Sequence, residues 1–409
     1  MFSARVKTGV FVLEGLNAYA TMVYFAYLFF FMRDRFGFTN LENLTLCAVN
    51  GAVYAGWVSF AGRFAQRHGY FRALKLGFVI MGLALVIGSG LGSVAGHYLT
   101  MIAWTFGIGL TWPALEAITS EQEPPERLQR LLGIYNLVWS VSSGLATFTG
   151  GAILEKLGPR GIFLLPAAMH AVQVAWAVYL ERESRRPFTV ARPPETTTPV
   201  SAARAEAKRS PVPRKTFLRM AWIANPFAYV AMNAIIPVIP DLARKFALTP
   251  AWAGVFCSVW ALARAAGFVV CWRWTGWHYR FRWLLGAYLA MVLGVVVILL
   301  VNHLWLLVGA QAVFGLSLAL IYYSSLYYSM DVGETKGEHG GFHEAAIGAG
   351  IFGGPAVGAA SLYFFPAYAT MNAWAVSVLL LGGLGWLLAL RARRAPTGRS
   401  EAARHDPGG

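Results

Sequence analysis

Residues Gly341–Leu362 of this chain read GFHEAAIGAGIFGGPAVGAASL. The segment is apolar and about 20 residues long, which is the length that crosses the hydrocarbon core of a bilayer as a helix. Its glycines crowd one side, at Gly348, Gly350, Gly354 and Gly358. Because glycine lets a neighbouring helix approach closely, the segment predicts a tightly packed membrane helix.

An earlier segment repeats this one. It reads GIYNLVWSVSSGLATFTGGAIL and spans Gly133–Leu154. The offset from residue 133 to residue 341 is 208, and the same offset relates Asn17 to Asn225 and Phe106 to Phe314. The same offset at three places indicates that the second half of the chain is a duplicate of the first. Two similar membrane halves are the layout of many secondary transporters.

The composition is that of a membrane protein. Of the 409 residues, 57% are hydrophobic and 13% are charged, whereas a soluble domain carries about 25% charged residues. The net charge of +15 lies in loops and a linker between apolar segments, so we expect no nucleic-acid partner. The three cysteines lie in apolar segments without disulfide or metal-ligand spacing, and no phosphate-binding loop or nucleophile elbow occurs. We therefore expect the protein to bind no cofactor and no metal, and to have no enzymatic activity.

Twelve apolar segments predict an all-α integral membrane protein with two pseudo-symmetric six-helix bundles. The expected spans are 9–32, 41–62, 74–94, 98–119, 131–153, 161–180, 218–240, 251–272, 283–301, 304–328, 341–363 and 367–390. We assign residues 1–180 to the first bundle and 217–390 to the second. Residues 181–216 form a basic linker and 391–409 a basic tail, and their composition predicts disorder.

The positive charges predict the orientation. With the N-terminus inside, the inner segments hold 27 of the 34 lysines and arginines, and the outer loops hold six. Inner loops are the basic ones in membrane proteins. We expect both termini and the linker to be cytoplasmic, in a plasma membrane, or the inner membrane if the source is bacterial. The linker also suits contact with anionic lipid heads.

The loop after the second span resembles a signature of the major facilitator superfamily. That signature is Gly, three residues, Asp-Arg, one residue, Gly and then basic residues; here Gly62, Arg67, Gly69 and Arg72 match, and Gln66 replaces the Asp. The twelve spans and the long central linker are similar to the family as well. The resemblance covers residues 9–390 and implies a transporter that works by alternating access, with spans one, four, seven and ten lining the path.

The sequence Gly350-x-x-x-Gly354-Pro355-x-x-Gly358 resembles the antiporter motif of this family. The family has that motif in span five, whereas here it lies in span eleven, the repeat-equivalent position. Pro355 removes a backbone donor and the glycines thin the helix, which favours a bend at a close contact. Gly354 and Pro355 are therefore gating candidates, and ordinary small-residue packing is the alternative.

A charged side chain inside a membrane span costs free energy, so each one is expected to have a charged partner or a functional role. Arg264 lies near the middle of span eight. An arginine stays protonated there, so it faces a carboxylate, a cavity or an anionic ligand. A substrate anchor for a carboxylate or phosphate is one interpretation, and a structural ion pair with a glutamate is the other.

Two glutamates are candidates for proton coupling. Glu14 lies about one and a half turns into span one, and Glu116 lies near the cytoplasmic end of span four. Burial disfavours the charged form of a carboxyl group, which suits it to carry a proton. A gate ion pair is the alternative for Glu14.

A second gate is expected at the cytoplasmic side. In the resembled family the basic loop after span two lies against the start of span eleven. Glu344 then pairs with Arg63 or Arg67, and His343 adds sensitivity to pH. For Glu344, favourable placement in the first helical turn is the simpler explanation.

Neutral polar residues complete the predicted substrate site. The candidates are Asn17, Tyr24, Asn225, Asn233, Gln311 and Tyr322, with an aromatic belt at the interface as the alternative for the span-ten tyrosines.

The sequence thus predicts a monomeric secondary transporter in the lipid bilayer. Its substrate is a small organic solute, anionic or zwitterionic, and protons are the coupling ion. Efflux of drug-like amphiphiles by antiport is the runner-up. A non-transporting sensor and a polytopic membrane enzyme are the alternatives of a different class.

Overall fold

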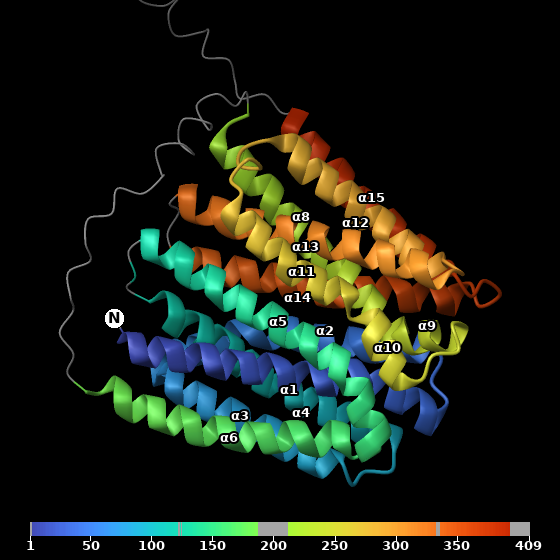
Figure 1. Cartoon of the computed structure of the whole chain (residues 1–409), viewed down its shortest axis with the longest axis horizontal. Helices are drawn as coiled ribbons and strands as arrows, with labels where there is room; N and C mark the ends of the chain where they lie inside the picture. Colours follow the sequence, from blue (N-terminus) through green and yellow to red (C-terminus); the bar gives the residue numbers. More distant parts are fainter. Residues whose placement is uncertain (1, 122, 124, 187–211, 333–335, 393–409) are drawn as a thin grey trace, which may run out of the picture.

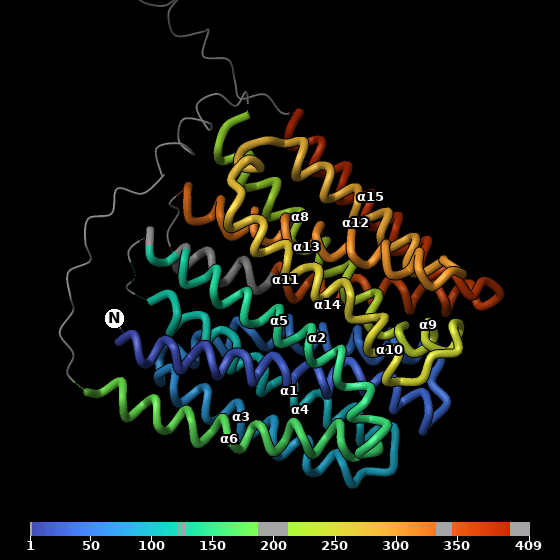
Figure 2. Tube along the Cα trace, viewed as in Figure 1, coloured from blue at the N-terminus to red at the C-terminus, as the bar shows by residue number. Residues whose placement is uncertain are grey.

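The computed structural model describes residues 2–121, 123, 125–186, 212–332 and 336–392, and Figure 2 traces them in colour. Through these residues the chain forms α-helices and one short 3-10 helix. Twelve helical segments of the described chain are long and apolar enough to cross a membrane. The expected all-α fold with twelve spans is therefore confirmed.

Six helices make up the first half. They are α1 (Ala4–Phe36), α2 (Asn40–His68), α3 (Tyr70–Gly88), α4 (Val94–Ser120), α5 (Pro125–Leu157) and α6 (Gly161–Ser184). Polar caps fix where they begin: the Ser3 side chain accepts from the Val6 N–H at the start of α1, and Thr39 and Glu42 form a capping box at the start of α2.

The second half has six spans built from more pieces. They are α8 (Arg214–Ile235) with η1 (Ile236–Val238) and α9 (Ile239–Lys245), α10 (Pro250–Cys257) with α11 (Val259–Arg273), α12 (Phe281–Leu300), α13 (Leu304–Val332), α14 (Lys336–Phe364) and α15 (Met371–Ala392). The seventh span is interrupted because Pro237 and Pro240 lack the backbone N–H that an unbroken helix needs. The eighth is interrupted at Ser258.

The helix bounds repeat with the offset found in the sequence. Moving the start of α2, residue 40, by 208 gives 248, beside the start of α10 at Pro250. Moving the start of α6, residue 161, gives 369, beside the start of α15 at Met371. The duplication therefore extends to the arrangement of the helices.

Two expected boundaries are wrong: the twelfth span was expected to begin at residue 367, but α15 begins at Met371, and the third span ends early. The third span was expected to run to residue 94, but α3 ends at Gly88 and α4 begins at Val94. The intervening Ser89–Ser93 is rich in glycine and serine, which favour turns over helix.

The halves lie side by side in Figure 1, with α1–α6 in the lower part, α8 and α11–α15 above them, and α9 and α10 at the right, level with α2 and α5. Helix α2 packs on α14, and α5 packs on α10 and α11. We call the end with residues 4, 184 and 214 the linker end, and the end with the turns at 36–40 and 245–250 the far end (Figure 1). The bundle bounds of 1–180 and 217–390 stay predictions, and the two sets of helices span Ala4–Ser184 and Arg214–Ala392. Most of the expected linker and tail lies outside the described residues.

The glycines of the segment quoted first are contact points of α14. An added Cβ at Gly354 would overlap the backbone oxygen of Val230 on α8, and one at Gly348 would lie 2.8 Å from Ala55 Cα on α2. One helix thus packs closely on a helix of its own half and on a helix of the other half.

Candidate functional site

A cavity of about 130 Å³ lies between the two halves. Helices α1, α2, α4 and α5 line it from the first half, and α8, η1, α11, α13 and α14 from the second. Its aromatic lining residues are Phe25, Tyr54, Trp104, Trp112, Tyr135, Trp139, Tyr229, Trp260 and Tyr322. Its polar and charged lining residues are Glu14, Thr21, Asn50, Thr105, Glu116, Asn136, Ser143, Asn233 and Arg264. An apolar cavity with a few convergent polar groups is typical of a small-molecule site.

Arg264 is buried at the wall that the second half contributes, with 4% of its surface exposed. Its Nε donates to Ser140 Oγ at 3.2 Å, and its guanidinium carbon lies 4.2 Å from the centre of the Trp139 ring and 5.2 Å from that of Trp260. No carboxylate lies within 4.0 Å of it among the described residues. The guanidinium is therefore held by aromatic faces and a hydroxyl, without a described counter-ion.

Glycine packing positions the helix that carries Arg264. Helices α11 and α13 touch through Gly315, where a Cβ would overlap the Trp260 oxygen, and through Gly267, where it would lie 2.6 Å from Ala319 Cβ. This contact fixes which face of α11 is turned towards α13 and leaves Arg264 on the face towards the cavity.

Glu14 is fully buried on the wall that the first half contributes. Its Oε2 accepts from the Tyr135 hydroxyl at 3.0 Å, and its Oε1 has no partner among the described residues. Glu116 of α4 lines the same cavity. Helix α5 comes close to α1 because Gly15 faces it, with Ser142 Oγ 3.2 Å from where a Cβ would lie. Two carboxyl groups thus face the cavity from one half, and Arg264 faces it from the other.

Three of the expected substrate residues surround Arg264. Asn233 and Tyr322 line the cavity, and Asn225 lines a smaller adjoining pocket that Arg264 shares. The Asn225 Oδ1 is buried without a partner in the described part of the chain, whereas the Asn233 amide donates to the Tyr229 oxygen at 2.9 Å.

The other three expected substrate residues do not line either pocket. Asn17 is buried in α1, and Tyr24 packs its ring against Trp104 at 4.8 Å. Gln311 donates from Nε2 to the Phe256 oxygen at 2.8 Å within the second half. These side chains occupy the packed interior of their own halves.

Four of the six expected gate residues lie towards the linker end. Arg63 and Arg67 are exposed near the end of α2 and make no ion pair with any described residue. Residues 343 and 344 belong to α14, but the side chains of His343 and Glu344 lie outside the described residues. Gly354 and Pro355 lie further along α14, at its contact with α8.

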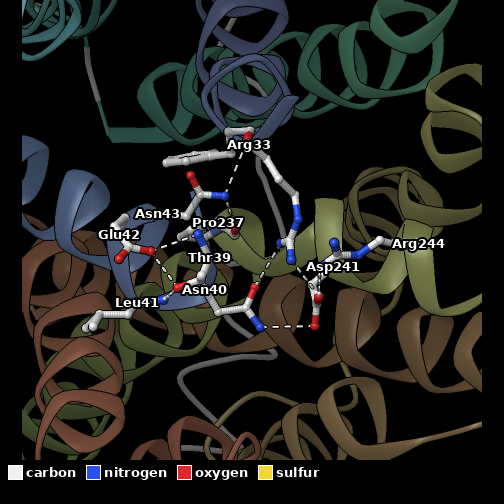
Figure 3. Close-up of polar contacts among 10 residues, drawn as sticks. Arg33, Thr39, Asn40, Leu41, Glu42, Asn43, Pro237, Asp241 and Arg244 are labelled. Atoms are coloured by element: carbon white, nitrogen blue, oxygen red, sulfur yellow. Dashed lines mark hydrogen bonds and ion pairs between the residues drawn. The ribbon is translucent and has the colours of Figure 1, made fainter. Parts of the chain in front are cut away.

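The far end holds a polar connection between the halves, shown in Figure 3. Arg33 of α1 pairs with Asp241 of α9 at 2.8 Å, and the Asn40 amide donates to the other oxygen of Asp241 at 3.1 Å. The Asn43 amide donates to the Pro237 oxygen at 3.1 Å. We call Arg33, Asn40 and Asp241 the far-end clasp.

Sequence reasoning missed the clasp, although the sequence contains a signal for it. Arg33 and Asp241 are separated by 208 positions, which is the repeat offset. Equivalent positions close to a pseudo-two-fold axis meet each other, so an opposite-charge pair at the repeat offset is a usable signal. Trp139, Ser140 and Tyr135 were missed as well, because aromatic and small polar residues in an apolar span are too common to stand out.

The comparison with known families agrees with this architecture. The family model for the Major Facilitator Superfamily matches residues 10–228, more than half of the chain. The chain therefore belongs to the major facilitator superfamily, and the resemblance read from its sequence is confirmed. It is a multi-pass membrane protein of a transporter family.

Solved structures with this fold cover nearly the whole chain. A bacterial homologue of the human lysosomal transporter Spinster, inward-facing and unoccupied, matches with a TM-score of 0.67 and 14% identity over 95% of both chains. A mutant of the nucleoside transporter NupG matches with a TM-score of 0.66 and 13% identity over 94% of this chain and 98% of that one. At these identities the likeness concerns the fold alone.

The match to curated relatives covers a smaller part of the chain. Two probable quinate permeases from strains of Aspergillus fumigatus are 24% identical over 175 residues, which is 39% of this chain and 32% of each relative. The chain thus spans about a third of the length of the curated relatives that it matches.

Proposed function

We propose that this protein is a secondary active transporter that moves a small organic solute with an anionic group across the membrane by alternating access. The observation that carries the proposal is Arg264, a buried guanidinium at the cavity with no described carboxylate partner. Burying an unpaired charge costs on the order of several kcal/mol. A solute carboxylate or phosphate would remove that cost by accepting two parallel hydrogen bonds from the guanidinium.

Protons are the proposed driving ion. Glu14 and Glu116 face the same cavity, so their protonation state affects any charged solute that enters it. Asn225, Asn233 and Tyr322 are the proposed additional contacts, because they lie around Arg264. Asn17, Tyr24 and Gln311 stay outside this contact set, since they do not line the cavity.

The aromatic lining supports a second candidate. Nine aromatic side chains around one cavity also suit an amphiphilic solute that is expelled by antiport. The anionic solute is preferred, because an amphiphile without a negative group leaves Arg264 uncompensated. The quinate named for the fungal relatives is an anion and agrees with this preference.

The orientation and the linker-end gate are part of the proposal. The excess of lysine and arginine in alternate loops supports cytoplasmic termini in the plasma membrane. In that orientation the far-end clasp faces outside, and Arg67 with Glu344 forms the inner gate. A single chain supplies both walls of the cavity, which supports a monomer as the working unit.

The test is thermal stability of the purified protein against a library of carboxylates, phosphates, zwitterions, organic cations and neutral amphiphiles. A ligand at 100 times its Kd stabilises the native state by about 2.7 kcal/mol. We expect carboxylates or phosphates to raise the Tm of wild type and of Arg273→Ala, an exposed arginine at the end of α11, and to leave Arg264→Ala unchanged.

Arg264→Lys separates charge from geometry, because lysine keeps the charge and loses the planar fork. Equal stabilisation of wild type and Arg264→Ala by cations or neutral amphiphiles would favour efflux instead. Flux of the stabilising solute into proteoliposomes, driven by a pH gradient, then tests transport itself. Absence of pH-driven flux would reject the proton coupling.

A further inference from the structure

The smaller pocket beside the cavity has a volume of about 20 Å³, and we call it the side pocket. Arg264 lines both spaces. The described residues that line only the side pocket are Asn225, Ala228 and Leu318, and Asn225 is the polar one. A space of this size holds about one water molecule, so the side pocket admits a single small polar group.

Asn225 brings a buried hydrogen-bond acceptor to the side pocket. The residue is 1% exposed, and its Oδ1 has no hydrogen-bond partner among the described residues. A buried acceptor without a donor costs free energy, and a donor that reaches it removes that cost. The side pocket is therefore suited to a group that carries an O–H or an N–H.

Packing against α14 sets the orientation of α8 at this pocket. An added Cβ at Gly350 would overlap the backbone oxygen of Pro226, and one at Gly354 would overlap that of Val230. The residues of α8 that line the side pocket lie three or four positions apart and form a different face, namely Asn225, Ala228, Tyr229 and Met232. Helix α8 therefore cannot turn Asn225 away from the pocket without separating from α14.

The guanidinium of Arg264 lies along the same face of α8. Its Nη1 is 3.3 Å from the Met232 Sδ, about two helical turns beyond Asn225. One solute can therefore place an acidic group on the guanidinium and a donor in the side pocket. The donor should be uncharged, because an ammonium group would lie near the guanidinium in a site of low dielectric, where like charges repel strongly.

We propose that the side pocket is a subsite for a hydroxyl group and that the solute is a hydroxy acid: its acidic group binds Arg264, and its hydroxyl donates to the Asn225 Oδ1. This inference rests on the proposed transport of an anion and names the class of anion. Asn225 is the residue that distinguishes hydroxylated acids from plain ones. A plain acid brings no donor to the acceptor, and an amino acid brings a second positive charge towards Arg264.

The test compares butyrate with the three positional isomers of hydroxybutyrate and of aminobutyrate, which share one carbon chain. The Kd of each acid for the purified full-length protein follows from the rise in Tm with acid concentration. We expect at least one hydroxybutyrate to bind wild type about tenfold more tightly than butyrate, because a site built to accept a hydrogen bond discriminates against the analogue that lacks the donor. Butyrate that binds as tightly as every hydroxybutyrate would overturn the subsite, and tighter binding of the aminobutyrates would overturn the uncharged donor.

Asn225→Leu keeps a side chain of similar volume and removes the acceptor. The preference for the hydroxybutyrate over butyrate should fall from about tenfold to about onefold, while butyrate keeps its affinity. This ratio is taken within one variant, so a change in the stability of the protein cancels. The matched control is Asn17→Leu, which should keep the preference, because Asn17 is equivalent to Asn225 at the repeat offset, is buried in α1 and lines neither pocket. A preference that survives in Asn225→Leu would refute the role of Asn225.

The subsite and the anion anchor fail in different ways. If butyrate and the hydroxybutyrates stabilise wild type equally and do not stabilise Arg264→Ala, the anchor stands and the subsite is rejected. If neither butyrate nor any hydroxybutyrate raises the Tm of wild type, the carboxylate anchor is rejected together with the subsite. If Asn225→Leu does not fold, the comparison of these acids on wild type still decides whether a hydroxyl group is preferred.

Discussion

Trp139 is the nearer of the two aromatic rings that face the Arg264 guanidinium, with 4.2 Å between the guanidinium carbon and the ring centre. It belongs to α5 of the first half, whereas Arg264 belongs to α11 of the second. The contact thus joins the two halves directly at the cavity. A cation–π contact of this kind contributes about 0.5–2 kcal/mol.

We expect Trp139→Leu to weaken binding of the stabilising anion by about 2- to 30-fold, since the guanidinium loses the ring that orients it. Trp139→Phe keeps an aromatic face and should lose less. The measurement is a titration of Tm with the solute identified in the library. Trp386→Leu on α15, where the indole is 57% exposed, is the control and should bind as wild type. Wild-type affinity in Trp139→Leu would contradict this role.

At the scale of single residues, the charged residues of the cavity could be predicted from the sequence, whereas the neutral residues around them could be predicted less well. Glu14, Glu116 and Arg264 stood out because an ionised side chain in an apolar span is rare. Asn17 and Tyr24 were expected at the cavity but lie in the packed interior. Spans that are apolar on nearly every side have no polar face to mark which residues look into a cavity.

Helix α14 shows the same limit of sequence-based prediction at the scale of a whole helix. Its glycines were correctly predicted to make close helix contacts, but which partner each one faces came only from the structure. Gly354 faces the backbone of Val230 on α8, whereas for its neighbour Gly353 the nearest atom to an added Cβ is 3.7 Å away. Two adjacent glycines therefore differ in what they tolerate.

This difference gives a paired prediction. We expect Gly354→Ala to lower the free energy of unfolding by about 1–3 kcal/mol, because the helices must separate to admit the methyl group. Gly353→Ala should be neutral or stabilising, since alanine favours helix by up to about 1 kcal/mol. Thermal unfolding of the purified variants in detergent compares them. An equal Tm for the two variants would show that α14 can shift away from α8 without cost.

Element boundaries could be predicted where one physical signal dominates. Stretches of about 20 apolar residues revealed all twelve spans. The interruptions of the seventh and eighth spans were not foreseen, because membrane helices tolerate proline when neighbouring groups satisfy the freed carbonyls. The early end of α3 follows from its Gly- and Ser-rich turn, which hydropathy alone does not separate from the span.

The whole molecule combines a symmetric scaffold with an asymmetric charge pattern. Applying the repeat offset of 208, Glu14 corresponds to Trp222 and Arg264 corresponds to Gly56. Among the described residues that line the cavity, the carboxyl groups thus belong to the first half and the guanidinium to the second. Duplication explains the fold, whereas the proposed function depends on residues in which the two copies differ.

The far-end clasp lies where the two copies meet. Arg33 and Asp241 occupy equivalent positions and pair across the interface, with 11% and 40% of their side-chain surfaces exposed. Partly exposed pairs contribute up to about 1 kcal/mol, so losing this one should raise the population of molecules that are open at the far end by about fivefold. We therefore expect Asp241→Asn to favour opening at that end.

A native thiol reports this opening. Cys47 of α2 is fully buried, with its Sγ 3.8 Å from the Asn233 oxygen of the other half, so it becomes reachable only if α2 and α8 part. In a background with Cys257→Ala and Cys271→Ala, maleimide should label Cys47 about fivefold faster in the Asp241→Asn variant than in the protein that keeps Asp241.

The control for the charge change is Arg35→Gln, because Arg35 is exposed on the same turn and takes no part in the clasp. If Arg33 and Asp241 act as one clasp, Arg33→Gln adds nothing once Asp241 has been replaced, and the double variant labels at the rate of Asp241→Asn. Labelling that is equally slow in all variants would mean that α2 and α14 hold the far end closed by packing alone. The glycine contacts of α14, rather than the ion pair, would then keep the far end closed.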